Sequence, residues 1–159
     1  MTTRIARFAS AAGLAAAAAG AGQAQEHFTW YFPGEMRVTG TSEAKVVVER
    51  SRFFAVLFAA TSEDDVLAMV KMKKREHRKA NHHCWAFRGK DASGRAVERS
   101  KDDGEVGHPG KVLLELLRKD DLEGGLLVSR VFGGVKLGVG GVSRAFREAG
   151  AEAIAARQG

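Results

Sequence analysis

Two groups of residues in this chain have the composition of a phosphate-binding site. The first is a glycine-rich loop with one lysine, flanked by two arginines; its candidate anion- or nucleic-acid-binding residues are Arg130, Gly133, Gly134, Lys136, Gly140, Gly141 and Arg144. A loop between a strand and a helix can offer backbone N–H groups to an anion, because the first helical turn leaves its donors unpaired. The same glycines could instead supply positive φ angles and let the helix lie close to the sheet. Both interpretations remain open.

The second group is a tight turn that carries three acids, Asp102, Asp103 and Glu105. Grouped carboxylates can bind Mg²⁺, with water and a substrate phosphate filling the remaining positions. They could equally cap the next helix by accepting hydrogen bonds from its free backbone N–H groups. With a metal, the chain would be an enzyme acting on a phosphorylated small molecule, and the acidic turn would have to meet the glycine loop in one cleft.

A third candidate is a basic patch at the end of a predicted helix, formed by Lys73, Lys74, Arg75 and Arg78. The patch is compatible with contacts to a nucleic-acid backbone, as is the formal net charge of +6. Cations are also favourable at any helix C-terminus, so a solvated helix face is the alternative. The stem of Lys73 could also join the buried stripe of this helix. No aromatic residue interleaves with the patch, which argues against base stacking there.

Thiol or zinc chemistry is disfavoured. His82, His83 and Cys84 are adjacent in a predicted strand, and successive strand residues point to opposite faces, so the three cannot readily hold one ion. Cys84 is the single cysteine, which excludes an internal disulfide and suits a reducing compartment.

The elements that must position these residues follow from hydrophobic patterning. Residues 1–25 form an alanine-rich low-complexity or targeting segment, and residues 26–159 form one domain. No apolar run reaches the ~18 residues that a membrane span needs. We predict helices that begin near Thr61, near Lys111 and after the glycine loop, and strands at residues 44–49, 51–59, 82–88, 95–100 and 126–132.

Four segments occur in a recognisable order: Glu49-Arg50-Ser51-Arg52-Phe53, His82 to Arg88, Lys101 to Glu105, and Arg130 to Phe146. Together they resemble the motifs of the IMPACT/YigZ family, and they correspond to its core domain, which we expect to stand alone. The resemblance implies an α+β fold: a two-layer, mostly antiparallel sheet with helices packed on one face. That fold is similar to domain IV of the translocation elongation factor and to the second domain of a small-subunit ribosomal protein.

The resemblance also implies a function. Eukaryotic members of the family restrain a starvation-responsive kinase that acts on a translation initiation factor, and bacterial members look like nucleic-acid-linked proteins. We therefore expect a non-catalytic regulator of translation initiation or the stress response. Its expected partner is a ribosome-associated or translation-factor protein, or RNA, and not a membrane. We expect no cofactor, apart from Mg²⁺ in the enzymatic alternative, and a cytoplasmic location, or an organelle if residues 1–25 are a presequence.

Overall fold

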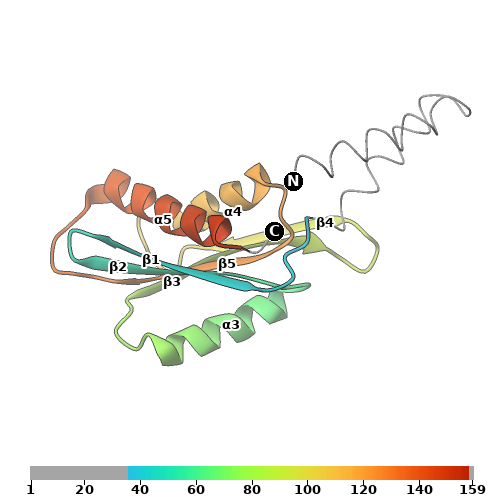
Figure 1. Cartoon of the computed structure of the whole chain (residues 1–159), viewed down its shortest axis with the longest axis horizontal. Coiled ribbons are helices and arrows are strands. Elements are labelled where there is room, and N and C mark those ends of the chain that lie inside the picture. The colour runs from blue at the N-terminus through green and yellow to red at the C-terminus, as the bar shows by residue number, and fades with distance from the viewer. Residues whose placement is uncertain (1–35, 158–159) are drawn as a thin grey trace, which may run out of the picture. The chain divides into compact units, whose positions relative to one another are not determined.

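The computed structural model describes residues 36–157, in which five strands and three helices follow one another (Figure 1). The strands are β1 (Thr41–Val48), β2 (Ser51–Phe58), β3 (His82–Lys90), β4 (Ala96–Lys101) and β5 (Gly124–Val131). The helices are α3 (Glu63–Glu76), α4 (Pro109–Lys119) and α5 (Gly138–Ala155). These elements match the predicted ones in type and order. The predicted segment 1–25 lies outside the described residues.

The strands form one sheet in the order β1-β2-β5-β3-β4, and every neighbouring pair is antiparallel. The central strand is β5, and all eight of its residues are buried. Glu49 and Arg50 join β1 to β2 with φ angles of 48° and 69°, the backbone that a two-residue hairpin turn requires. The predicted α+β class and antiparallel sheet are therefore confirmed.

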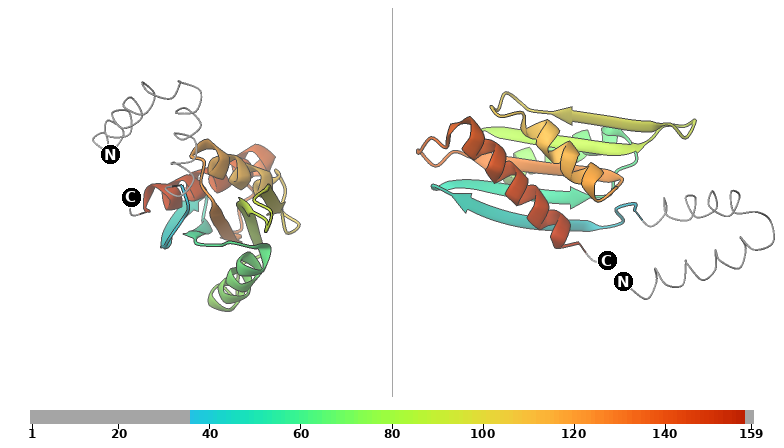
Figure 2. Two further views of the ribbon diagram at one scale, coloured as in Figure 1. Left: turned by 90° about the vertical axis from the view of Figure 1, so that its right-hand side faces the viewer. Right: turned by 90° about the horizontal axis from the view of Figure 1, so that it is seen from above.

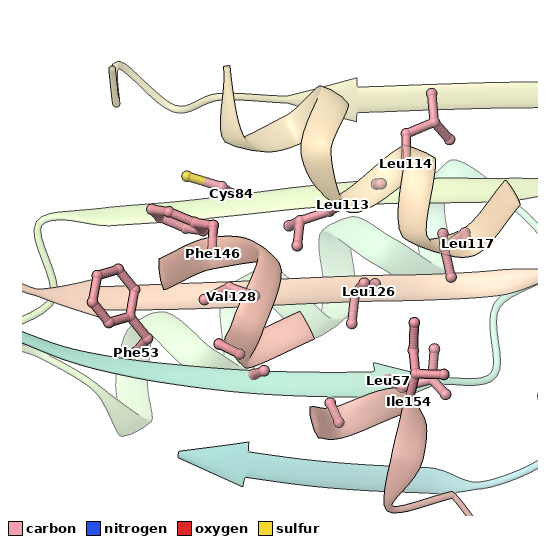
Figure 3. Close-up of a cluster of buried hydrophobic side chains, with 14 of the residues drawn as sticks. Phe53, Leu57, Cys84, Leu113, Leu114, Leu117, Leu126, Val128, Phe146 and Ile154 are labelled. Atoms are coloured by element: carbon pink, nitrogen blue, oxygen red, sulfur yellow. The ribbon is translucent and has the colours of Figure 1, made fainter. Parts of the chain in front are cut away.

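The larger core lies between the sheet and the pair α4 and α5, which run side by side across one face (Figure 2). Phe53 of β2 meets Phe146 of α5 edge to face, with ring centroids 5.2 Å apart. Apolar side chains at helical spacing on both helices fill the space above the strands (Figure 3), among them Leu113, Leu117 and Ile154. This core holds the N-terminal end of α5 over the sheet.

Helix α3 covers the opposite face of the sheet (Figures 1 and 2). Its Val66 packs there with Val56, Trp85, Phe87 and Leu127. The expectation that all helices share one face is therefore wrong. The physical reason is that the central strands are apolar on both sides, so each side must be covered. The predicted alternation in β3 is confirmed: Cys84 belongs to the α4–α5 core, and Trp85 belongs to the α3 core.

None of the helices in the described part of the chain has the length and apolarity that crossing a membrane requires.

Candidate functional site

Three connections meet at one end of the sheet, on the left in Figure 1: the β1–β2 turn, the α3–β3 loop and the β5–α5 loop. Hydrogen bonds tie them together. The Asn81 N–H donates to the Arg130 carbonyl oxygen at 2.8 Å, and the Phe132 N–H donates to Asn81 Oδ1 at 2.8 Å. The Gly133 N–H donates to Ser51 Oγ at 3.1 Å. Segments far apart in sequence are thereby fixed against one another.

The glycines of the β5–α5 loop have structural roles. A Cβ on Gly133 would lie 2.1 Å from the carbonyl carbon of Arg50, so only glycine fits against the β1–β2 turn. Gly134 and Gly138 have φ angles of 91° and 72°, where other residues are strained. Gly140 and Gly141 lie in the first turn of α5, which has no side-chain cap. The structural interpretation of the loop is confirmed at Gly133, Gly134 and Gly138.

Two carboxylates of the acidic turn bind backbone amides. Asp102 Oδ1 accepts a hydrogen bond at 2.8 Å from the Gly110 N–H in the first turn of α4, which is the predicted capping role. Asp103 Oδ2 accepts one at 2.8 Å from the His83 N–H at the start of β3. The turn therefore fastens α4 and β3 to the same end of the sheet.

The third carboxylate, Glu105, forms a buried ion pair with Arg130. Arg130 Nη1 lies 2.9 Å from Glu105 Oε2, and the two side chains are only 7% and 4% exposed. The Arg130 guanidinium carbon also lies over two aromatic rings, 5.5 Å from the centroid of Phe53 and 5.6 Å from that of Phe132. The expectation that Arg130 faces outward to bind an anion is therefore wrong, because Glu105 holds it inside.

The enzymatic alternative requires the acidic turn and the glycine loop to meet in one cleft. The observed contact is made by their neighbours: Ser143 Oγ in α5 donates to the carbonyl oxygen of Gly107, after the acidic turn, at 2.8 Å. The carboxylates of Asp102, Asp103 and Glu105, however, are directed to three separate partners. Between residues 36 and 157, no group of three or more His, Cys, Asp or Glu side chains is arranged to hold a metal ion.

The predicted basic patch loses one member. Lys73 is 7% exposed, and its Nζ lies 3.1 Å from Glu43 and 2.9 Å from Glu76. Burial alone would lower the pKa of Lys73, but hydrogen bonds to the Glu76 and Glu43 carboxylates outweigh it and hold the pKa above its ordinary value. Lys73 thus belongs to the buried stripe of α3, the other role predicted for it, and Lys74, Arg75 and Arg78 remain exposed.

Exposed cations from every connection gather at this end of the sheet. We call this set the cationic end; its members are Arg50, Arg52, Lys74, Arg75, Arg78, Lys79, Lys101, Lys136 and Arg144. None of these side chains forms an ion pair with another residue in the described range. Glu49, Asp102 and Asp103 lie at the same end but are outnumbered. Lys136 and Arg144 are therefore accessible, as predicted.

Four cations at the other end of the sheet are paired with carboxylates, whereas Arg95 and Lys119 there are exposed and have no such partner among the described residues. Glu98 binds both Arg88 and Arg118, Lys90 lies 3.5 Å from Glu123, and Arg157 lies 3.6 Å from Asp120. The positive charge of the domain is thus largely neutralised at one end and left available at the other. Such an asymmetric field attracts polyanions to one surface.

One residue of this surface was missed by the sequence analysis. The pattern placed Phe132 inside the last strand, but β5 ends at Val131, and Phe132 is 45% exposed beside the cationic end. An exposed phenylalanine in a loop and a buried one in a strand look the same in sequence. Only the glycine pair directly after it indicated that the strand was ending.

Comparison with known proteins gives one consistent family. The sequence model of the family described as the Impact N-terminal domain matches residues 49–154 of this chain. The IMPACT family member YvyE of Bacillus subtilis is 33% identical over 119 residues, which cover 74% of this chain and 54% of YvyE. An IMPACT family member of Thermus thermophilus is 37% identical over 109 residues, covering 68% of this chain and 57% of that protein.

A solved structure supports the fold. The crystal structure of a hypothetical protein superposes with a TM-score of 0.70 at 27% identity, covering 76% of this chain and 60% of that one. The chain spans about half the length of the curated relatives that it matches.

Proposed function

Because this chain belongs to the IMPACT family, we propose that it is a non-catalytic regulator linked to translation that binds RNA through its cationic end. The observation that carries the proposal is the separation of charge along the sheet. Four cations are paired with carboxylates at one end, whereas none of the nine in the cationic end has such a partner among the described residues. Unpaired surface cations are what a phosphate backbone requires, since they displace its counterions.

The fold presents these cations as a set. They come from the β1–β2 turn, α3, β4, the β5–α5 loop and the first turns of α5. Hydrogen bonds of Ser51 and Asn81 join the β5–α5 loop to its neighbours, and one of Asp103 joins the acidic turn to β3. A fixed spread of guanidinium and ammonium groups can contact several successive phosphates at once. The positions therefore favour an extended polyanion over a single small anion.

The chemistry of the neighbouring groups supports a binding role. The carboxylates of the acidic turn are engaged by Gly110, His83 and Arg130. Burial raises the pKa of the Cys84 thiol far above its ordinary value, and its Sγ donates to the Asp102 carbonyl oxygen, so this thiol is not prepared as a nucleophile. These groups stabilise the end of the sheet that carries the cations.

The proposal is tested by measuring RNA affinity by fluorescence anisotropy at two salt concentrations. With about three phosphate contacts, a fourfold rise in salt should weaken binding to single-stranded RNA by roughly 20-fold. The double variant Lys136→Glu with Arg144→Glu should lose most of the affinity and of the salt dependence. The matched control reverses two exposed cations at the other end, Arg95→Glu with Lys119→Glu, and should stay within about twofold of the parent.

Equal losses in the two double variants, or affinity that ignores salt, would contradict a specific cationic surface. The link to translation predicts that RNA crosslinked to the chain in cells is enriched in ribosomal, transfer or initiation-region RNA. Crosslinks without that enrichment would leave RNA binding in place and remove the link.

A further inference from the structure

Phe132 stands out among the residues beside the cationic end. It is a large apolar side chain in a loop, 45% exposed, in the connection that also carries Lys136. Its ring lies over the Arg130 guanidinium, at 5.6 Å from ring centroid to guanidinium carbon. The buried pair of Arg130 with Glu105 fixes that guanidinium, so the ring has a rigid support beneath it.

The backbone that carries the ring is also fixed. The Phe132 N–H donates to Asn81 Oδ1, and the next N–H, that of Gly133, donates to Ser51 Oγ. A Cβ at Gly133 would collide with the Arg50 backbone, which shows how closely the loop lies against the β1–β2 turn. The ring is thus held in place before any ligand arrives, and little conformational entropy is lost when one binds.

We propose that the cationic end binds single-stranded RNA, with an unpaired base stacked on Phe132 and the neighbouring phosphates contacted by Lys136, Arg144 and Arg50. The inference rests on the proposed function and deepens it. An exposed aromatic ring contributes nothing to contacts with the phosphates of a duplex, whose base faces are stacked and hidden. On a single strand, the same ring binds a base of any identity while the cations follow the backbone.

Two more exposed apolar side chains follow Phe132 along the chain and fit this occupant. Val135, in the same loop, is 38% exposed, and Val139, in the first turn of α5, is 59% exposed. They add exposed apolar surface to the connection that carries Phe132 and to the start of α5, where a splayed base and ribose can rest. An acidic protein segment would also match the charges, but it would not require an aromatic ring at position 132, so substitutions there separate the two occupants.

The experiment uses the full chain with two fluorescein-labelled probes, a short oligouridine and a blunt RNA duplex of the same length. Phe132→Leu keeps an apolar side chain and removes the aromatic face. It should weaken oligouridine binding by about tenfold and change duplex binding by less than about twofold. Phe132→Trp keeps a stacking surface and should retain the parental affinity. Its tryptophan emission should be quenched by oligouridine more strongly than that of the parent chain. Thermal unfolding of each variant confirms that it is folded.

The outcomes distinguish base stacking on Phe132 from RNA binding by the cationic end. If Phe132→Leu binds oligouridine as the parent does, while the Lys136→Glu and Arg144→Glu variant binds neither RNA, stacking is overturned and RNA binding stands. If Phe132→Leu weakens both probes equally, the ring shapes the surface and does not stack, which also overturns the inference. If the parent chain binds neither RNA probe, the proposed function fails together with the inference.

Discussion

At the scale of single residues, the contact with the clearest energetic consequence is the buried pair of Arg130 and Glu105. Removing one partner leaves a charge buried without compensation. We expect Glu105→Ala to lower the free energy of unfolding by about 3–5 kcal/mol in urea titrations. Glu115→Ala, at an exposed position of α4, should change it by less than about 0.5 kcal/mol.

A third variant separates charge compensation from packing at this pair. Glu105→Leu combined with Arg130→Met replaces both partners with apolar side chains, and it should recover much of the loss. If the combined variant is as unstable as Glu105→Ala, the pair acts mainly by shape and hydrogen bonding.

Glu98 gives a prediction about how the stability of the fold depends on pH. Hydrogen bonds from Arg118, with Arg88 adding to them, hold the pKa of Glu98 below the ordinary 4.5, although burial opposes the shift. A lowered pKa in the folded state means that the contribution of Glu98 to stability is present above about pH 4.5 and is lost as the pH falls through the folded value. In thermal unfolding, Glu98→Gln should be less stable than the parent at pH 7. The two melting curves should approach each other below pH 4.5; a gap that stays constant with pH would contradict this linkage.

The residue scale is also where prediction from sequence was least successful. Lys136 and Arg144 were correctly expected on the surface, but Arg130 was wrongly grouped with them, and for Lys73 the exposed and the buried role were both left open. Arg130 is held by a carboxylate that is distant in sequence, Glu105, and Lys73 is held by the distant Glu43 together with the nearby Glu76. The accessibility of a cation depends on tertiary pairing, and local sequence does not encode that pairing.

At the scale of elements, the fit of the β5–α5 loop against the β1–β2 turn can be tested at one glycine. A Cβ at Gly133 would meet three backbone atoms of Arg50 and Ser51 at 2.1–2.5 Å, and backbone cannot rotate away as a side chain can. We expect Gly133→Ala to destabilise the domain by about 1–3 kcal/mol in urea unfolding. Gly40→Ala is the control, because a Cβ there meets nothing within 4 Å, and its unfolding curve should match that of the parent.

The strands and helices were easier to predict than the exposure of single side chains, because the spacing of hydrophobic residues is a property of the local sequence. The alternation of His83, Cys84, Trp85 and Ala86 gave both the strand and its two faces, and Ser62 with the acids that follow gave the start of α3. The side of the sheet on which α3 packs was predicted wrongly. An amphipathic helix shows that it has a buried face, but its pattern does not say which face of a two-sided sheet it will cover.

At the scale of the whole domain, the separation of charge could not have been predicted from net charge. The total of +6 is the same whether the cations are dispersed or gathered. The hairpin turns and helix termini place Arg50, Arg78, Lys136 and Arg144 at one end, and the topology of the sheet alone brings these positions together.

The order of the strands has a consequence for synthesis of the chain. The central strand, β5, is hydrogen-bonded to β2 on one side and to β3 on the other, yet it is the last of the five to leave the ribosome. Until about residue 131 has emerged, the inner edges of the β1–β2 and β3–β4 hairpins have no partner strand. Isolated hairpins are at best marginally stable, and open edges invite pairing with other chains. The five-stranded sheet therefore cannot close until the strand from Gly124 to Val131 is available to join the two halves, late in translation.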